Sequence, residues 1–224
     1  MTSRVIAIDG PAGSGKSTTA KAVAGRLELA HLDSGALYRA ATLAALNAEI
    51  DIDGEGIVEL AESLPVCLRL TDAGFRPEVA GVDVSQEIRS DRVTRRVSEV
   101  AALPQVREWV NRALRDATAL HPRGVVIDGR DIGTVVFPDA LLKVFLTAGT
   151  DERARRRLLQ EGRAADEANV REAAGRIARR DRYDSSRQVA PLTQAEDALL
   201  LDTTGLSFEQ QVDRVVELAR KVFS

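Results

Sequence analysis

The sequence predicts an α/β fold: a doubly wound parallel sheet flanked by helices, with a small antiparallel insert and an arginine-rich helical lid. Short apolar runs alternate with helix-like segments along most of the chain, which is the pattern of parallel strands joined by crossover helices. Residues 65–84 interrupt it with short strand-like runs joined by Asp-Ala-Gly and Ala-Gly turns. Residues 151–187 read as two helices around Gly162 and hold eleven arginines. These observations predict the core, the insert and the lid.

The first apolar run, Val5–Ile8, is rich in β-branched residues and predicts a buried strand. A helix is expected over residues 18–29, because small and apolar residues recur there at positions i, i+3, i+4 and i+7. Further strands are expected at residues 125–127, 142–146 and 199–201. Candidate functional residues follow several of these runs, as expected for a parallel sheet that binds ligands at the carboxyl ends of its strands.

Length and composition narrow the class of protein. A chain of 224 residues fits one α/β domain, and its net charge of -3 disfavours a general nucleic-acid binder. Cys67 is the only cysteine, and His31 and His121 are the only histidines, which excludes an intrachain disulfide and disfavours cysteine or histidine metal sites. No apolar stretch approaches the roughly 18 residues of a membrane span, and no signal-like region follows the N-terminus. We therefore expect a cytoplasmic protein without a membrane partner.

Between the first strand and the first helix lies a glycine-rich segment that fits the P-loop pattern G-x-x-x-x-G-K-S. Its glycines let backbone N–H groups converge on one point, where the positive end of the following helix also favours an anion. Lys16 can then reach the β- and γ-phosphates of a nucleotide, and the Ser17 hydroxyl can ligate Mg²⁺. A plain glycine-rich turn is the alternative, but the strand–loop–helix context favours nucleoside triphosphate binding. The segment comprises Gly10, Pro11, Ala12, Gly13, Ser14, Gly15, Lys16, Ser17 and Thr18.

Two more segments carry side chains suited to phosphate chemistry. In residues 32–39, we expect Ser34 to cap a helix, Tyr38 to pack against a base or sugar, and Arg39 to reach a phosphate. A plain capped helix is the alternative there. In residues 125–133 (VVIDGRDIG), a strand ends at Asp128, which resembles the Walker-B acid that holds Mg²⁺ directly or through water.

The same VVIDGRDIG segment offers groups for an acceptor. Arg130 can hold an acceptor phosphate with two parallel hydrogen bonds, and Asp131 can accept from an exocyclic amine of cytosine or adenine. An ion-paired turn is the alternative. The chain has no Asn-Lys-x-Asp run, so a regulatory GTPase is disfavoured. The compact size and the arginine-rich hairpin favour a small-molecule kinase, because arginines that close over phosphates also exclude water.

The chain resembles the bacterial cytidylate kinases along essentially its full length. The stretches that carry the resemblance are IDGPAGSGKST, LDSGALYRA, VSQEIRS, VIDGRDIGTVVFPDA and RYDSSRQVAPL, of which the last two are the most specific. The resemblance implies a single P-loop kinase domain over residues 1–224. Its monophosphate-binding region with the insert would span about residues 33–105, and its mobile lid about residues 151–187.

The resemblance also implies an activity and its partners. The chain would transfer a phosphoryl group from ATP to CMP or dCMP, giving CDP or dCDP, with Mg²⁺, as a cytoplasmic monomer in pyrimidine nucleotide metabolism. Residues 10–18 would hold ATP, and Ser17 and Asp128 the metal. Charge on the phosphates would be stabilised by Lys16, Arg130, Arg153, Arg157 and Arg187. The acceptor would be bound by Ser34, Tyr38, Arg39, Ser98, Arg107, Arg130, Asp131, Arg180, Asp184 and Arg187.

Within that acceptor set, Ser98, Arg107 and Asp131 are implied to read cytosine, and Asp184 to bind a ribose hydroxyl. A carboxylate beside a guanidinium and a hydroxyl matches the amine and acceptor edge of cytosine. Uracil would place a carbonyl against Asp131, a mismatch that costs about 1–3 kcal/mol, so CMP is expected over UMP. The rival readings are an adenylate-, uridylate- or shikimate-type kinase, and an ATP-binding regulatory or RNA-binding module that uses the arginine hairpin as a basic arm.

Overall fold

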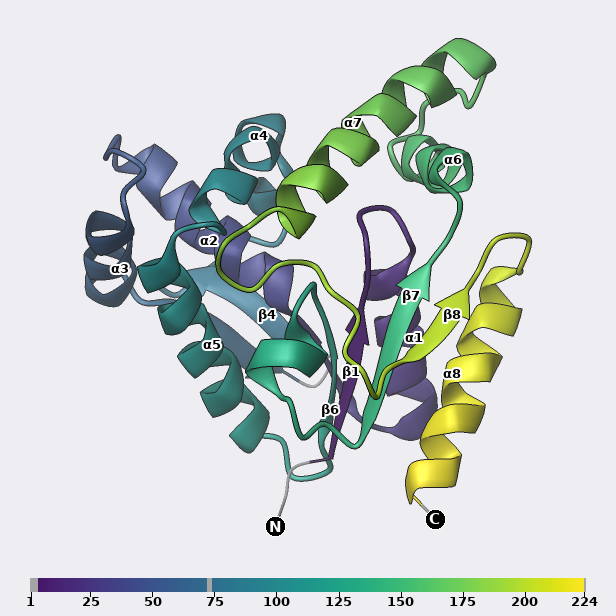
Figure 1. The fold of residues 1–224 in the computed structure, drawn as a ribbon. Helices are drawn as coiled ribbons and strands as arrows, with labels where there is room; N and C mark the ends of the chain where they lie inside the picture. The colour runs from purple at the N-terminus through teal and green to yellow at the C-terminus, as the bar shows by residue number, and fades with distance from the viewer. Residues whose placement is uncertain (1–3, 72–73, 224) are drawn as a thin grey trace. The chain divides into compact units, whose positions relative to one another are not determined.

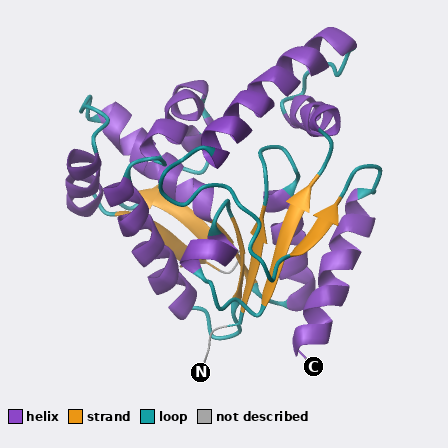
Figure 2. Cartoon of the chain, viewed as in Figure 1, coloured by secondary structure: helices purple, strands orange, loops and turns teal. Residues whose placement is uncertain are grey.

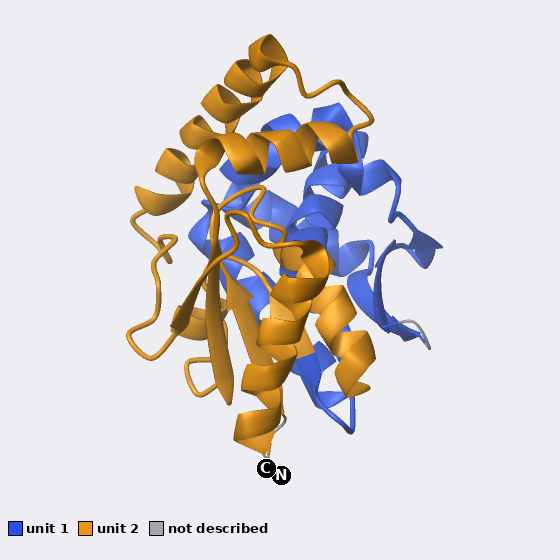
Figure 3. Cartoon of the chain, turned by 90° about the vertical axis from the view of Figure 1, so that its right-hand side faces the viewer, with its two compact units in different colours: residues 1–3, 30–125 blue, residues 4–29, 126–224 orange. Residues whose placement is uncertain are grey.

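A computed structural model describes residues 4–71 and 74–223 of the chain and shows an α/β architecture (Figures 1 and 2). The described residues form two compact units, coloured separately in Figure 3: unit 1 comprises residues 30–125, and unit 2 comprises residues 4–29 and 126–223. Unit 1 contains β2 (Ala30–Asp33), α2 (Ser34–Asn47), α3 (Gly54–Ser63), β3 (Val66–Thr71), β4 (Gly74–Val79), β5 (Val82–Asp83), η1 (Glu87–Arg89), α4 (Asp91–Val100) and α5 (Pro104–Ala119).

Unit 2 begins with β1 (Val5–Asp9) and α1 (Lys16–Leu27). It continues, after the strand β6 (Val125–Asp128) that joins the two units, with η2 (Ile132–Val136), β7 (Leu142–Thr147), α6 (Thr150–Gln160), α7 (Glu167–Ser185), β8 (Leu199–Asp202) and α8 (Phe208–Phe223). The larger sheet has five strands, of which β6, β1, β7 and β8 follow one another in this order and β2 is the fifth. The pairs β1–β7 and β7–β8 are parallel, so the predicted parallel sheet is confirmed.

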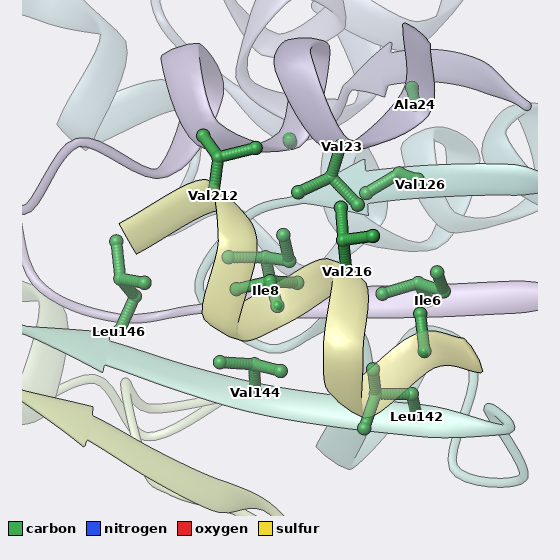
Figure 4. Close-up of a cluster of buried hydrophobic side chains, with 13 residues drawn as sticks. Ile6, Ile8, Val23, Ala24, Val126, Leu142, Val144, Leu146, Val212 and Val216 are labelled. Atoms are coloured by element: carbon green, nitrogen blue, oxygen red, sulfur yellow. The ribbon is translucent and has the colours of Figure 1, made fainter. Parts of the chain in front are cut away.

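The core of unit 2 lies between this sheet and helices α1 and α8 (Figure 4). Ile6 and Ile8 are fully buried and project from β1 toward Val23 of α1 and Val216 of α8. β-Branched residues predominate here because their side chains pack well on a pleated surface. The carboxyl ends of β1 and β6 carry Asp9 and Asp128 just beyond this apolar core.

The predicted pair of lid helices is present as α6 and α7, which pack on each other through an apolar cluster of their own. Leu158 from α6 and Ile177 from α7 belong to this cluster, and Ala12 of the P-loop packs with them. Asp166 caps α7 by accepting from the backbone N–H of Asn169. Hydrophobic contacts therefore attach the lid helices to the P-loop.

The insert in unit 1 is the antiparallel sheet that the sequence predicts, with strand order β3-β4-β5. Ala80 and Gly81 turn β4 into β5 with φ angles of 51° and 78°, the positive values that a tight hairpin of this kind requires. The other predicted turn includes Asp72 and Ala73, which lie outside the described residues. Glu78 is buried and pairs with Arg69 and Arg76 of the same sheet.

One local expectation is wrong, and one strand was not predicted. Ser34 does not cap α2: it is the first helical residue, and Asp33 is the N-cap, whose carboxylate accepts from the backbone N–H of Ala36 at 3.2 Å. The strand β2 was not predicted, because its four residues contain no apolar run: only Ala30 and Leu32 are apolar, and these are the two that are buried. Across the described residues, we find no helix with the length and apolarity to cross a bilayer.

Candidate active site

The P-loop has the backbone that its glycines predict. Gly10 has a φ of 148°, and a Cβ at this position would lie 2.0 Å from the backbone oxygen of Leu146, so any side chain there would collide with β7. Gly15 is the N-cap of α1 in the left-handed region, with a φ of 90°. The hydroxyls of Thr18 and Thr19 both donate to the Gly15 carbonyl at 2.8 Å. The sequence therefore builds one defined turn at the start of α1.

Lys16 lies buried inside this loop. Its Nζ donates to the backbone oxygen of Pro11 at 2.6 Å and to Ser14 Oγ at 3.3 Å. Burial, followed by the positive charge of Arg130, lowers the pKa of Lys16 well below its ordinary value. An ammonium group in such a position is stabilised when an anion approaches it, which is the role that a phosphate-binding lysine requires.

Ser17 and Asp128, the two residues predicted to hold a metal, meet at the head of α1. The Ser17 hydroxyl donates to Asp128 Oδ2 at 2.5 Å, and Asp128 is 4% exposed at the end of β6. Hydroxyl and carboxylate oxygens suit Mg²⁺, which takes only one or two carboxylates and completes its shell with water and phosphate oxygens. The described residues contain no group of three or more acidic, histidine or cysteine side chains that could hold a metal. One hydroxyl and one carboxylate fit an ion whose other ligands are phosphate oxygens and water.

A second cluster surrounds Asp184 at the end of α7. Asp184 is 1% exposed and accepts from Arg130 Nε at 3.0 Å and from the guanidinium of Arg187. The Arg187 guanidinium also lies 5.8 Å from the centre of the Tyr183 ring. The structure thus brings together three residues that the sequence analysis assigns to the acceptor. Arg130 lies 54 positions before Asp184, and Arg187 follows Asp184 by three positions. Asp184 holds both guanidiniums in defined orientations.

The lid arginines differ in their surroundings. Arg153 is buried and donates to the carbonyls of Ala148 and Ala12 at 2.9 Å and to Asp181 at 2.5 Å. Asp181 also accepts from the backbone N–H of Ala12 at 2.9 Å. Arg157, in contrast, is partly exposed and pairs with Glu161, the C-cap residue of α6. Arg153 is therefore engaged by protein acceptors of the P-loop and lid.

Arg156 was not singled out by sequence reasoning. It donates to the hydroxyl and carbonyl of Thr203 at 2.9 and 2.8 Å, and one of its guanidinium nitrogens lies 3.9 Å from the position that a Cβ on Gly15 would take. Arg156 thus lies beside the turn of the P-loop. The adjacent arginines 155, 156 and 157 look alike in the sequence, and only the helix register separates them.

Unit 1 carries five of the predicted acceptor residues. Arg107 is 3% exposed, donates to the carbonyl of Ala101 at 2.8 Å, and places its guanidinium 5.5 Å from the centre of the Tyr38 ring. Arg39 donates to the carbonyl of Ile88 and to Thr94 Oγ1, both at 3.0 Å. Ser34 is buried at the start of α2, and Ser98 is partly exposed on α4. Tyr38 and Arg107 thus form one stacked pair.

One further carboxylate of unit 2 had no role in the sequence prediction. Asp9, at the end of β1, is 6% exposed and accepts from the backbone N–H groups of Ile132 and Gly133. Burial raises its pKa to about 6, and these two hydrogen bonds only partly offset that effect. In the sequence, Asp9 is recognisable only as a polar residue at the end of an apolar strand. That position does not indicate that its carboxylate binds the N–H of Ile132, 123 residues away.

Comparison with known proteins identifies the family of the chain as a whole. The family model for cytidylate kinase matches residues 6–221. A cytidylate kinase of Desulfitobacterium hafniense (strain Y51) is 48% identical over 214 residues, which cover 95% of this chain and 91% of that protein. A cytidylate kinase of Citrobacter koseri is 46% identical over 221 residues, which cover 97% of this chain and 95% of that protein.

A solved structure, TT1252 from Thermus thermophilus, matches 100% of both chains with a TM-score of 0.50 and 19% identity, a likeness that concerns the fold alone. The family match, in contrast, includes the P-loop, the Ser17–Asp128 pair and the cluster around Asp184. Both relatives are matched over nearly their whole length. The chain therefore belongs to the cytidylate kinase family.

Proposed function

We propose that the chain transfers the γ-phosphoryl group of ATP to CMP and dCMP, with Mg²⁺, giving CDP and dCDP. The observation that carries this proposal is the Ser17–Asp128 pair at the mouth of the P-loop, inside a match to the cytidylate kinase family that spans residues 6–221. No observation favours an adenylate-, uridylate- or shikimate-type acceptor, or an RNA-binding module.

On the donor side, residues 10–18 would hold the ATP phosphates through backbone N–H groups, and Lys16 would bind the β- and γ-phosphates. Ser17 and Asp128 would hold Mg²⁺, which supplies charge neutralisation to the phosphates when it is bound. Arg157 is placed on the exposed side of α6, where release of Glu161 would free it for a phosphate. For Arg153, the same role requires it to leave Asp181 and the carbonyl of Ala12.

On the acceptor side, Arg39, Arg130, Arg180 and Arg187 would bind the monophosphate, and Asp184 a ribose hydroxyl. Ser34 and Tyr38 would line the same pocket. Asp131, together with Ser98 and Arg107, would read cytosine by accepting from its amine and donating to its carbonyl and ring nitrogen. This pattern rejects uracil, because a carboxylate would then face a carbonyl.

The chemistry needs positioning and charge stabilisation rather than a strong base, because the attacking oxygen of a monophosphate is already anionic. In-line transfer spreads charge over the phosphoryl oxygens, and the fixed positive groups of unit 2 would stabilise that charge. The orientations of Arg130 and Arg187 are set by Asp184 before any nucleotide arrives. Such preorganisation lowers the cost of reaching the transition state.

The deciding experiment measures ADP release from Mg-ATP when CMP, dCMP, UMP, AMP and shikimate are offered separately. Fast turnover with CMP and dCMP alone is the expected result. Turnover with AMP or UMP instead would keep the kinase and refute the cytosine assignment. No turnover with any acceptor would favour the ATP-binding module. The monomeric state and the cytoplasmic location stay predictions.

A further inference from the structure

We propose that Asp9 is a positioning residue for acceptor recognition: its carboxylate fixes the backbone of residues 129–133, and thereby the positions of Arg130 and Asp131. This inference rests on the proposed function, because Arg130 and Asp131 are the residues assigned there to the acceptor phosphate and the base. Asp9 itself need not touch a nucleotide.

Asp9 binds the C-terminal end of the turn formed by residues 129–133. Its Oδ1 accepts from the backbone N–H of Ile132 at 2.9 Å, and its Oδ2 accepts from the backbone N–H of Gly133 at 2.7 Å. The other end of the turn is tied to the preceding residue of the same strand, where the Ile8 carbonyl accepts from the N–H of Gly129 at 3.1 Å. Strand β1 therefore holds both ends of the segment that carries Arg130 and Asp131.

The turn is also packed from a second side. A Cβ on Gly133 would lie 3.0 Å from Lys143 Cδ and 3.4 Å from Asp9 Oδ2. Lys143 is 7% exposed, and its Nζ pairs with Asp197 at 2.8 Å, so its aliphatic stem cannot easily move away. Gly133 is thus enclosed between the carboxylate and the lysine stem, and the backbone at this point has little freedom to shift.

Only an ionised carboxylate matches the two amides that face this site. It offers two acceptor oxygens to two adjacent N–H donors, whereas an asparagine would turn an NH₂ group against one of them. The charge is costly here, since burial raises the pKa of Asp9 and the nearby charge of Asp131 adds to that effect. Lys16 and the two amides act in the opposite direction. A buried charge with this cost and two specific partners indicates a requirement for turn geometry rather than for core packing.

The competing explanation is that Asp9 acts through its charge on Lys16, which it helps to keep protonated. The two explanations predict different losses. Displacement of the turn would weaken binding of the acceptor and its discrimination while leaving ATP affinity intact. Loss of the negative charge beside Lys16 would weaken ATP binding and leave the preference for CMP over UMP unchanged.

The test is the Asp9→Asn variant, with KM and kcat measured for CMP and UMP and ATP affinity measured by calorimetry without acceptor. We expect the KM for CMP to rise, and the CMP/UMP ratio of kcat/KM to fall, by about tenfold or more, as expected when a hydrogen bond to a charged group is lost, with ATP affinity unchanged. Val216→Ala, which removes buried volume from α8, is the matched control for loss of stability. It should lower the melting temperature without changing the ratio.

An unchanged CMP/UMP ratio in Asp9→Asn would overturn the inference, whether or not ATP affinity falls. If that variant does not fold, Gly133→Ala perturbs the same turn by pressing a methyl group against Lys143, and it should raise the KM for CMP in the same selective way. A wild-type protein that does not prefer CMP over UMP would instead refute the cytosine assignment in the proposed function. The wild-type measurement therefore separates the two failures.

Discussion

At the end of β1, Asp9 faces two backbone amides, whereas Asp128 at the end of β6 faces the hydroxyl of Ser17. Asp184, at the end of α7, lies between two guanidiniums. All three are carboxylates in buried positions of unit 2, and their neighbours decide what each can do. Amides fix a backbone, a hydroxyl completes a metal site, and guanidiniums are themselves oriented for phosphate.

The assignment of Asp131 to the base predicts a change in specificity. Asp131→Ala removes the acceptor for the cytosine amine, so about 1–3 kcal/mol of discrimination between CMP and UMP should be lost. ATP binding should remain. The ratio of kcat/KM for CMP and UMP, compared with wild type, measures the effect, and a retained preference for CMP would refute the assignment.

The assignment of Asp128 to the metal predicts a change in Mg²⁺ dependence. Asp128→Asn leaves a neutral oxygen beside Ser17, so half-maximal activity should need about tenfold more Mg²⁺ or greater. Titration of activity with Mg²⁺ at saturating ATP measures it. Asp139→Asn, at an exposed position, is the control for a simple loss of one negative charge, and an equal shift in both variants would contradict the metal role.

The raised pKa of Asp9 predicts how stability depends on pH. The folded value of about 6 lies above the ordinary value of 3.8, so the folded protein binds this proton more tightly than the unfolded chain. As pH rises from 4 to about 7, the unfolding free energy of wild type should therefore fall relative to Asp9→Asn, by about 2 kcal/mol, and then level off. Denaturant unfolding of both proteins from pH 4 to 8 measures this difference. A flat difference would show that Asp9 keeps an ordinary pKa.

Among the elements, α6 and α7 are joined to the P-loop by hydrogen bonds as well as by apolar contacts. Asp181 of α7 accepts from the N–H of Ala12, and Arg153 of α6 donates to its carbonyl. The lid helices therefore hold the backbone of a loop residue directly. Any opening of these helices must either break those bonds or move the loop.

This connection predicts that Asp181→Asn weakens ATP binding, although Asp181 is not assigned to the nucleotide. Loss of the charged acceptor for Arg153 and Ala12 should cost about 1.5–3 kcal/mol of interaction, part of which would appear as lower ATP affinity. Calorimetric titration with ATP measures it. Arg176→Ala breaks an exposed pair with Glu172 on the same helix and should change affinity little. Equal effects in the two variants would contradict the connection.

Sequence patterns predicted most helices and strands because these elements are long or are bounded by glycine-containing turns. The P-loop, the lid helices and the Ala80–Gly81 hairpin each carry glycines or periodic apolar residues. β2 carries neither, and its polar residues His31 and Asp33 alternate with the two buried positions. The cap of α2 was misplaced by one residue because Asp33 and Ser34 are both good N-cap residues, and only backbone geometry distinguishes them.

At the scale of the whole molecule, one apolar core formed by β1, α1, β7 and α8 supports the P-loop and the other candidate site elements of unit 2. Leu142 is 5% exposed in β7 and belongs to this core. Leu142→Ala should therefore lower the unfolding free energy by about 2–5 kcal/mol while leaving the CMP/UMP ratio unchanged. Chemical denaturation and the two-substrate assay measure the two effects. A change in the ratio would mean that the core also sets specificity.

The residues of the candidate site could be predicted from the sequence only where they belong to a short local motif. Gly10 to Thr18 and the DGRD segment are such motifs, and the resemblance added the remaining residues. Contacts between distant positions could not be predicted. The two amides that bind Asp9 lie 123 and 124 residues away, and the acceptors of Arg153 depend on how α6 and α7 pack. Long-range pairing of this kind leaves no periodic trace in one sequence.

Cys67 in β3 makes the insert accessible to a kinetic measurement. It is the only thiol of the chain, and burial, together with the negative charge of Glu78, raises its pKa. Since the thiolate is the reactive form, alkylation at neutral pH should be slow while the sheet is intact and faster whenever β3 and β4 separate. A single maleimide reaction, followed with and without nucleotide, would therefore report changes in the exposure of β3 without any engineered label.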